Sequence, residues 1–136
     1  MTKKNAQIIF IAFNIVAVFL VAYVVNDFVS INGAIIDKEK IIPFDSGIYF
    51  FLLMTVFWIF SVIQYAGLKK KQSKVLKYAN IITIVWFIFM LILANIIPSY
   101  LENKLEMSGY VKCDDPSEIS RVVKGKSSLY RLDGCK

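Results

Sequence analysis

Three stretches of the sequence contain no Asp, Glu, Lys, Arg or His: Ile8–Val25, Ile48–Ala66 and Ile81–Ile97. As helices that rise about 1.5 Å per residue, they reach roughly 25–28 Å, close to the thickness of bilayer hydrocarbon. A helix satisfies its own backbone hydrogen bonds and can therefore cross lipid as an open segment. The pattern predicts a membrane protein of the all-α class with three transmembrane helices.

The positive charges indicate how these helices are oriented. The net charge is +6, and five lysines with no acid lie in the second loop, residues 67–80. Lysine-rich short loops stay in the cytoplasm beside anionic lipid, so this cluster favours lipid over nucleic acid as a partner. The N-terminus, residues 1–7, has Lys3 and Lys4. We therefore expect both of these segments in the cytoplasm, and residues 26–47 and 98–136 on the outer side of the membrane.

Both cysteines, Cys113 and Cys135, lie in the tail. In an oxidising compartment we expect them to form a disulfide, and closing such a loop contributes roughly 3 kcal/mol to stability. Two free thiols are the alternative if the tail is cytosolic. A zinc site is disfavoured, because the chain has no His and no second cysteine pair.

The segments outside the predicted spans carry local signals of secondary structure. Asn32-Gly33 between two apolar runs predicts a hairpin over residues 28–36, with an irregular loop as the alternative. Pro98 is expected to kink or end the third helix, and residues 99–107 can continue it up to a stop at Ser108-Gly109. Strands are expected at 110–113 and 128–132, around a short helix at 115–123. The tail is thus predicted to form a small extracytoplasmic, disulfide-stapled α+β cap.

Motifs that would indicate catalysis are missing from the sequence. With no His, a serine or cysteine triad has no base, and Asp114-Asp115 is better explained by a turn before a helix cap. We expect no enzyme activity, no cofactor and no metal. Three strongly hydrogen-bonding side chains inside the spans are predicted to link helices: Asn14, Gln64 and Asn95. For Asn14, a role in binding a ligand is the alternative.

The tail also offers aromatic and basic residues of the kind that anchor protein interfaces. A solvated face is the alternative for any one of them. The candidate partner-binding residues are Tyr110, Lys112, Arg121, Lys124, Lys126, Tyr130 and Arg131.

The end of the chain supports a resemblance to a known family. Lys104-Leu105, Gly109-Tyr110 and Cys113 are followed by Tyr130 and a near-terminal Cys135. This ending resembles a family of small enterobacterial inner-membrane proteins known only as a domain of unknown function. The resemblance implies a Gram-negative inner membrane and a periplasmic tail, and it implies no catalytic residues.

In plan alone, the chain is similar to immunity proteins against pore-forming colicins of the E1 type, which have three spans and an inside N-terminus. We therefore expect an inner-membrane protein that binds lipids and a protein partner and protects its own cell from a toxin. The alternatives are an accessory subunit of a larger inner-membrane complex and a phage holin. The sequence sets neither the partner nor the oligomeric state.

Overall fold

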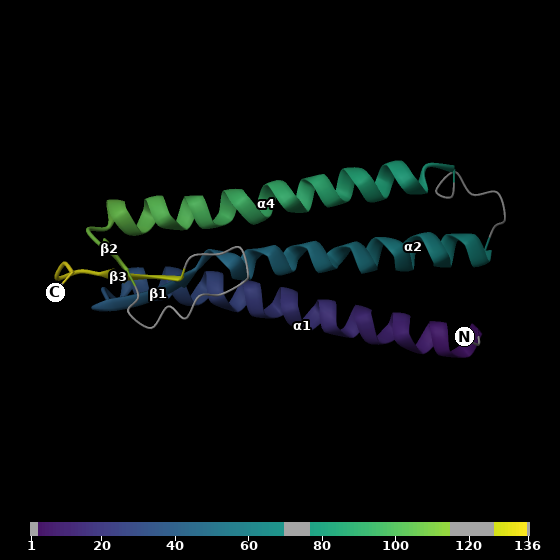
Figure 1. The fold of residues 1–136 in the computed structure, drawn as a ribbon, viewed down its shortest axis with the longest axis horizontal. Helices are drawn as coiled ribbons and strands as arrows, with labels where there is room; N and C mark the ends of the chain where they lie inside the picture. Colours follow the sequence, from purple (N-terminus) through teal and green to yellow (C-terminus); the bar gives the residue numbers. More distant parts are fainter. Residues whose placement is uncertain (1–2, 70–76, 115–126, 136) are drawn as a thin grey trace.

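The computed structural model describes residues 3–69, 77–114 and 127–135. Three long helical rods lie side by side, and a small sheet lies at one end of them (Figure 1). The rods are α1 (Lys3–Ile36), the 3₁₀ helix η1 (Ser46–Thr55) continued by α2 (Val56–Lys69), and α4 (Ala79–Met107). The middle rod lies between α1 and α4 (Figure 1).

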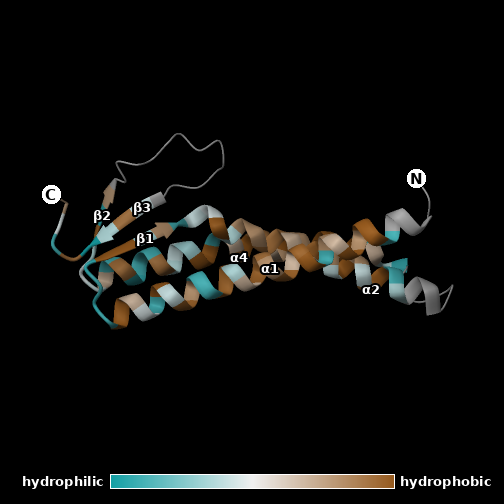
Figure 2. Ribbon diagram, turned by 90° about the horizontal axis from the view of Figure 1, so that it is seen from below, coloured by the Kyte–Doolittle hydropathy of each residue, from teal (hydrophilic) through white to brown (hydrophobic). Residues whose placement is uncertain are grey.

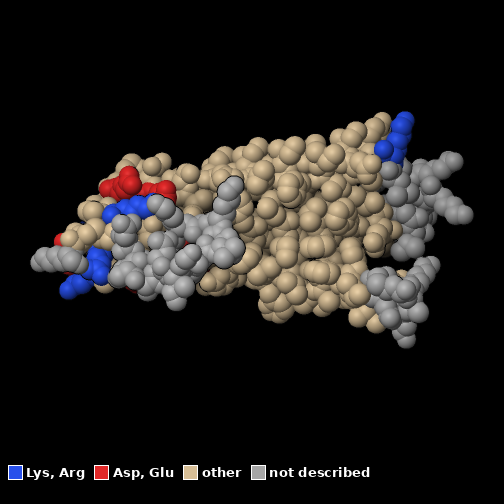
Figure 3. Space-filling view, viewed as in Figure 1, with Lys and Arg blue, Asp and Glu red and all other residues tan. Residues whose placement is uncertain are grey.

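Three helical segments among the described residues are long and apolar enough to cross a membrane: Gln7–Ile36, Ser46–Tyr65 and Ala79–Met107. At most 17% of the most apolar window in any of them is buried inside the molecule. Hydrophobic residues dominate the middle of the rods (Figure 2), and the visible face shows an uncharged band between charged ends (Figure 3). These features indicate a multi-pass membrane protein.

The hairpin expected at residues 28–36 does not form, because α1 continues without a break to Ile36. Val24 and Ile31 recur at helical spacing and are buried in the same core, so packing outweighs the local turn signal. Asn32 donates to the Phe28 carbonyl oxygen (2.7 Å) and accepts a bond from Lys104, which also stabilises the helical form. A Cβ atom added at Gly33 would have no neighbouring atom within 4 Å, so the helix needs no glycine there.

The third rod passes through Pro98 and ends later, at Met107. Leu101 and Leu105 are completely buried beyond the proline, and this packing holds the extra turns in place. Gly109, with φ of +90°, then closes the helix. The Gly109 N–H donates to the Glu106 oxygen and the Tyr110 N–H to the Leu105 oxygen, which is the pattern of a Schellman motif.

Gly109→Ala is expected to destabilise the fold by about 1 kcal/mol, because a Cβ disfavours positive φ. No atom lies within 4 Å of the position that this Cβ would take, so the cost is conformational and not steric. Thermal unfolding in detergent, followed by circular dichroism, measures the change. Gly33→Ala, inside α1, is the matched control and should be neutral or slightly stabilising. Equal losses in the two variants would contradict the explanation.

The first half of the middle rod is a ten-residue 3₁₀ helix, longer than most. Three residues per turn place Tyr49, Leu52 and Thr55 in one row. Tyr49 and Thr55 are buried, and Leu52 packs against the core. The 3₁₀ geometry therefore directs a single row of side chains into the space between α1 and α4.

The sheet has three antiparallel strands in the order β1-β3-β2, formed by Ile41–Asp45, Ser127–Arg131 and Val111–Asp114 respectively. The strands expected in the tail are present, whereas β1 was not expected. Pro43 lies in β1 at the edge of the sheet, where a missing N–H donor is tolerated. The helix expected at 115–123 lies outside the described residues.

The buried core joins the sheet to the helices. Ile42, Phe44 and Tyr130 come from the strands, and Leu101 and Leu105 from α4. The remaining buried members come from α1, η1 and the turn after α4: Val24, Ile31, Tyr49 and Tyr110. One continuous core therefore fixes the sheet, which we call the cap, to the ends of the helices.

Candidate functional site

The cap is held to the helices by the ring and hydroxyl of Tyr110. This hydroxyl donates to the backbone oxygen of Glu39 (2.9 Å) and is 3.5 Å from that of Ala34. Tyr130 is 0% exposed, and its ring meets Phe44 edge-on at 6.0 Å. Burial raises the pKa of both tyrosines, so both remain neutral.

The predicted disulfide between Cys113 and Cys135 is confirmed, with Cα atoms 5.6 Å apart. It ties β2 to the segment that follows β3. In the register of the sheet, Cys113 aligns with Leu129 and Pro43, on the opposite face from Tyr130. The crosslink therefore reinforces the sheet from outside the core.

The candidate partner-binding residues of the tail fall into three groups. Tyr110 and Tyr130 were expected on the surface but are buried, because each ring fills the core of the cap. Lys112 is exposed and Arg131 is partly exposed. Arg121, Lys124 and Lys126 lie outside the described residues. Of the candidates that the structure describes, Lys112 and Arg131 are the two that are not buried.

Lys112 forms an ion pair with Glu102 of α4, at 2.9 Å. The hydrogen bond to this carboxylate raises the pKa of Lys112, so its ammonium stays charged through the neutral range. Its Nζ also lies 5.9 Å from the centre of the Tyr130 ring. The ammonium is thus exposed but held in place by Glu102.

A second basic position lies at the tip of the cap. Lys40, Arg131 and Asp133 line a pocket of about 220 Å³ together with Ile41 and Gly134. The Nε of Arg131 is buried and has no hydrogen-bond acceptor among the described residues. The pocket is therefore lined by charged side chains of both signs.

Polar side chains also connect the rods. Ser61 of α2 donates to the Asn14 side-chain oxygen of α1, at 2.8 Å. Asn95 instead donates to the Leu91 carbonyl oxygen of its own helix, and Gln64 is exposed with no hydrogen bond among the described residues. Of the three predicted linkers, Asn14 is the one that the structure brings to another helix.

Among the described residues, three further hydrogen bonds between rods were not anticipated. Trp86 donates to Thr55 (3.0 Å), Tyr49 to Asp27 (2.9 Å), and Lys104 to Asn32. The first contact could have been expected from the sequence, because Trp86 lies in the middle of its span, away from both membrane–water interfaces, where a Trp side chain packs against another helix. The other two form only because α1 remains helical beyond residue 25. The predicted hairpin over residues 28–36 excluded this.

Tyr49→Phe is expected to lower the free energy of unfolding by about 1–3 kcal/mol, because the Asp27 carboxyl loses a donor where water cannot fully replace it. Denaturant unfolding in detergent measures this change. Tyr23→Phe is the matched control, since Tyr23 is 52% exposed on the same side of the molecule's apolar band. A neutral Tyr49→Phe variant would show that the bond contributes nothing net.

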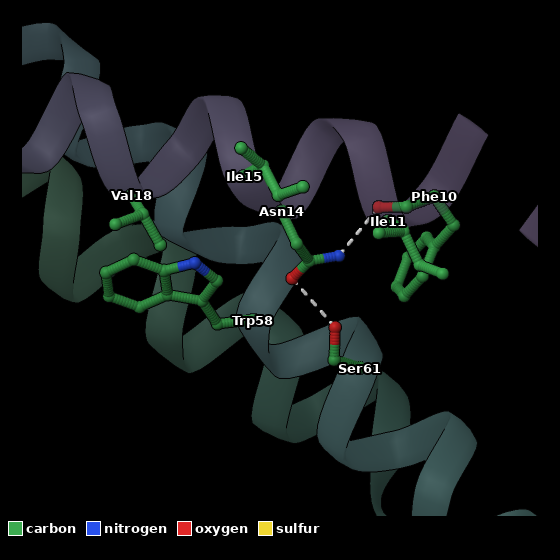
Figure 4. Close-up of a pocket in the computed structure, with 7 residues that line it drawn as sticks. All are labelled: Phe10, Ile11, Asn14, Ile15, Val18, Trp58 and Ser61. Carbon is green, nitrogen blue, oxygen red and sulfur yellow. Dashed lines mark hydrogen bonds between the residues drawn. The ribbon is translucent and has the colours of Figure 1, made fainter. Parts of the chain in front are cut away.

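A groove of about 440 Å³ lies between α1 and α2 in the apolar band. Asn14 and Ser61 form its polar part, and Trp58 and Val18 line it alongside (Figure 4). Its remaining lining is apolar and comes from α1: Phe10, Ile11 and Ile15. The groove suits an apolar chain or helix that offers a hydrogen-bonding group.

The described residues thus form two surfaces: a cap with charges of both signs at one end and a groove along the rods. No group of three or more His, Cys, Asp or Glu side chains that could hold a metal occurs within residues 3–69, 77–114 and 127–135.

These features define a class: small proteins with three helices of membrane-spanning length and a disulfide-linked cap. The chain belongs to the family described as "Protein of unknown function (DUF1240)", whose model matches residues 35–130. This range runs from the end of α1 to β3 and includes all but the last residue of the sheet. No curated protein and no solved structure matches the chain.

Proposed function

We propose that this protein is an integral binding protein of a bacterial inner membrane that protects its own cell from a membrane-acting or periplasmic toxin. The N-terminus and the lysine-rich loop lie in the cytoplasm, and the cap lies in the periplasm. The lysine distribution supports this orientation. The disulfide supports it independently, because such bonds persist in oxidising compartments.

One observation carries the proposal: the cap and the rods share a single buried core. A toxin that binds the cap is thereby held at a fixed place beside the membrane, and it cannot move into the bilayer freely. Lys112 and Arg131 supply charged contacts on the cap, and the groove between α1 and α2 supplies an apolar one.

The test is a protection assay. A strain that lacks the gene, and the same strain carrying it on a plasmid, are challenged with the product of the neighbouring effector gene and with sibling cells. We expect the plasmid to restore survival. The double variant Lys112→Glu/Arg131→Glu should lose protection, whereas Glu106→Lys, a charge reversal at an exposed position of α4, should keep it.

Unchanged survival after deletion in every challenge would overturn the proposal. Purification in mild detergent then distinguishes the alternative, an accessory subunit, because a stoichiometric transporter or enzyme would be recovered with the chain. Lysis upon overexpression would instead favour a holin.

A further inference from the structure

The disulfide lies at the tip of the cap, where water-soluble reagents can reach it. The segment after β3 turns at the end of the molecule farthest from the N-terminus, beyond the rods (Figure 1). The two bonded residues differ in exposure, because Cys113 is 8% exposed whereas Cys135 is an exposed residue. A thiol exchanges with a disulfide by attacking one of its two sulfurs, and access decides which sulfur is attacked. The difference in exposure therefore favours attack at Cys135.

The disulfide is also the attachment of the residues that follow Leu132. The Leu132 N–H donates to the Lys40 carbonyl oxygen (3.2 Å), and the Leu132 side chain packs against the core. Beyond this position, Asp133 and Gly134 form no hydrogen bond or ion pair within the described part of the chain. Residues 133–135 are therefore held to the cap by the bond to Cys113.

The same residues form part of the wall of the pocket at the tip of the cap. Asp133 and Gly134 line this pocket of about 220 Å³ together with Arg131 at the end of β3. Lys40 and Ile41, at the start of β1, complete its lining. The core of the cap lies on the opposite face of the sheet from Cys113. Release of residues 133–135 would therefore open the pocket and leave the side chains of the core in place.

We propose that the Cys113–Cys135 bond is a thiol-exchange site: a thiol attacks the Cys135 sulfur, and reduction releases residues 133–135 and opens the pocket. The attacking thiolate forms a mixed disulfide with Cys135, and the electron pair of the broken S–S bond leaves on the Cys113 sulfur, which takes a proton from water. A second thiolate then displaces the Cys135 sulfur. The reactant is a dithiol, such as a thiol oxidoreductase; it supplies both electrons and becomes a disulfide.

The proposal does not depend on the protective function, and its tests use the wild-type chain. In the first test, the folded, oxidised protein in detergent reacts briefly with glutathione, acid stops the reaction, and peptide mass spectrometry locates the adduct. We expect at least about ten adducts at Cys135 for each one at Cys113, because access limits the attack. The same reaction in denaturant is the matched control and should give similar amounts of the two adducts, since both sulfurs are then accessible.

A second measurement asks whether reduction releases the segment. NMR relaxation of the backbone amides, in detergent, compares the protein before and after reduction with dithiothreitol. The order parameter of Gly134 should fall from about 0.85 to below about 0.6. Gly109 is the matched control: both glycines have positive φ (+79° at Gly134, +90° at Gly109), but the turn at Gly109 is closed by backbone hydrogen bonds. Its order parameter should stay near about 0.85.

Equal numbers of adducts at the two cysteines of the folded protein, or a majority at Cys113, would overturn the proposal. An unchanged order parameter at Gly134 after complete reduction would show that other contacts hold the segment and would also overturn it. A simultaneous fall at Gly109 would mean that reduction loosens the whole cap, which contradicts a local release. Loss of toxin protection with both measurements as expected would refute the proposed function alone.

Discussion

Replacing Tyr130 with alanine is expected to lower the free energy of unfolding by about 3–5 kcal/mol, the largest effect of a single substitution in the cap. Tyr130 lies on the central strand, is fully buried, and contacts Phe44 edge-on. Its removal leaves a cavity between the sheet and α4 that the short strands cannot close. Chemical denaturation in detergent, followed by near-ultraviolet circular dichroism, measures the loss.

Tyr130→Phe removes the hydroxyl and keeps the ring, so it separates their contributions to stability. The hydroxyl is buried, and its one polar neighbour among the described residues is the Lys112 ammonium, which makes no hydrogen bond of regular geometry to it, so its deletion should change stability by less than about 1 kcal/mol. A loss of several kcal/mol in Tyr130→Phe would show that the hydroxyl, and not the ring, holds the cap. If Tyr130→Ala did not change the free energy of unfolding, the Tyr130 ring would not be what stabilises the cap.

The second large effect is expected from the crosslink. Cys113→Ala combined with Cys135→Ala should cost about 3 kcal/mol, because the disulfide joins two residues 22 positions apart in the sequence and restricts the unfolded chain. In membrane vesicles, a protease added on the side where the cap lies should then cut the tail. The helices α1, α2 and α4 should remain protected by lipid.

Wild-type protein treated with a reductant should show the same cleavage pattern as the double variant, which controls for packing changes at the two alanines. Unchanged protease resistance in both samples would mean that the strands hold the tail without the covalent bond. Cleavage within the rods would show that the membrane-spanning helices need the disulfide to stay folded, contrary to our expectation.

The sequence predicted those parts of the fold that follow from local chemistry. Uncharged runs of sufficient length indicate the three helices, and two lone cysteines in one segment indicate their pairing. The stop at Gly109 follows from the need for a positive φ. Each of these inferences requires only neighbouring residues or a single property of the chain.

Long-range packing explains the errors. The dipeptide Asn32-Gly33 favours a turn locally, but burial of Ile31 and the contact with Lys104 keep it helical. Strand β1 was missed because its partner, β3, is more than 80 residues away in the sequence. The same distance explains why Tyr130 was expected on the surface and is found in the core.

The order of the strands in the sheet has a consequence for biogenesis. The strand that lies between the other two, β3, is the last of the three to leave the ribosome. Until it arrives, β1 and β2 have no neighbour to pair with, and Cys135 has not yet been synthesised. The cap is therefore completed only after all three rods have been made, and in a nascent chain interrupted before residue 127 the apolar side chains of β1 have no strand to pair with.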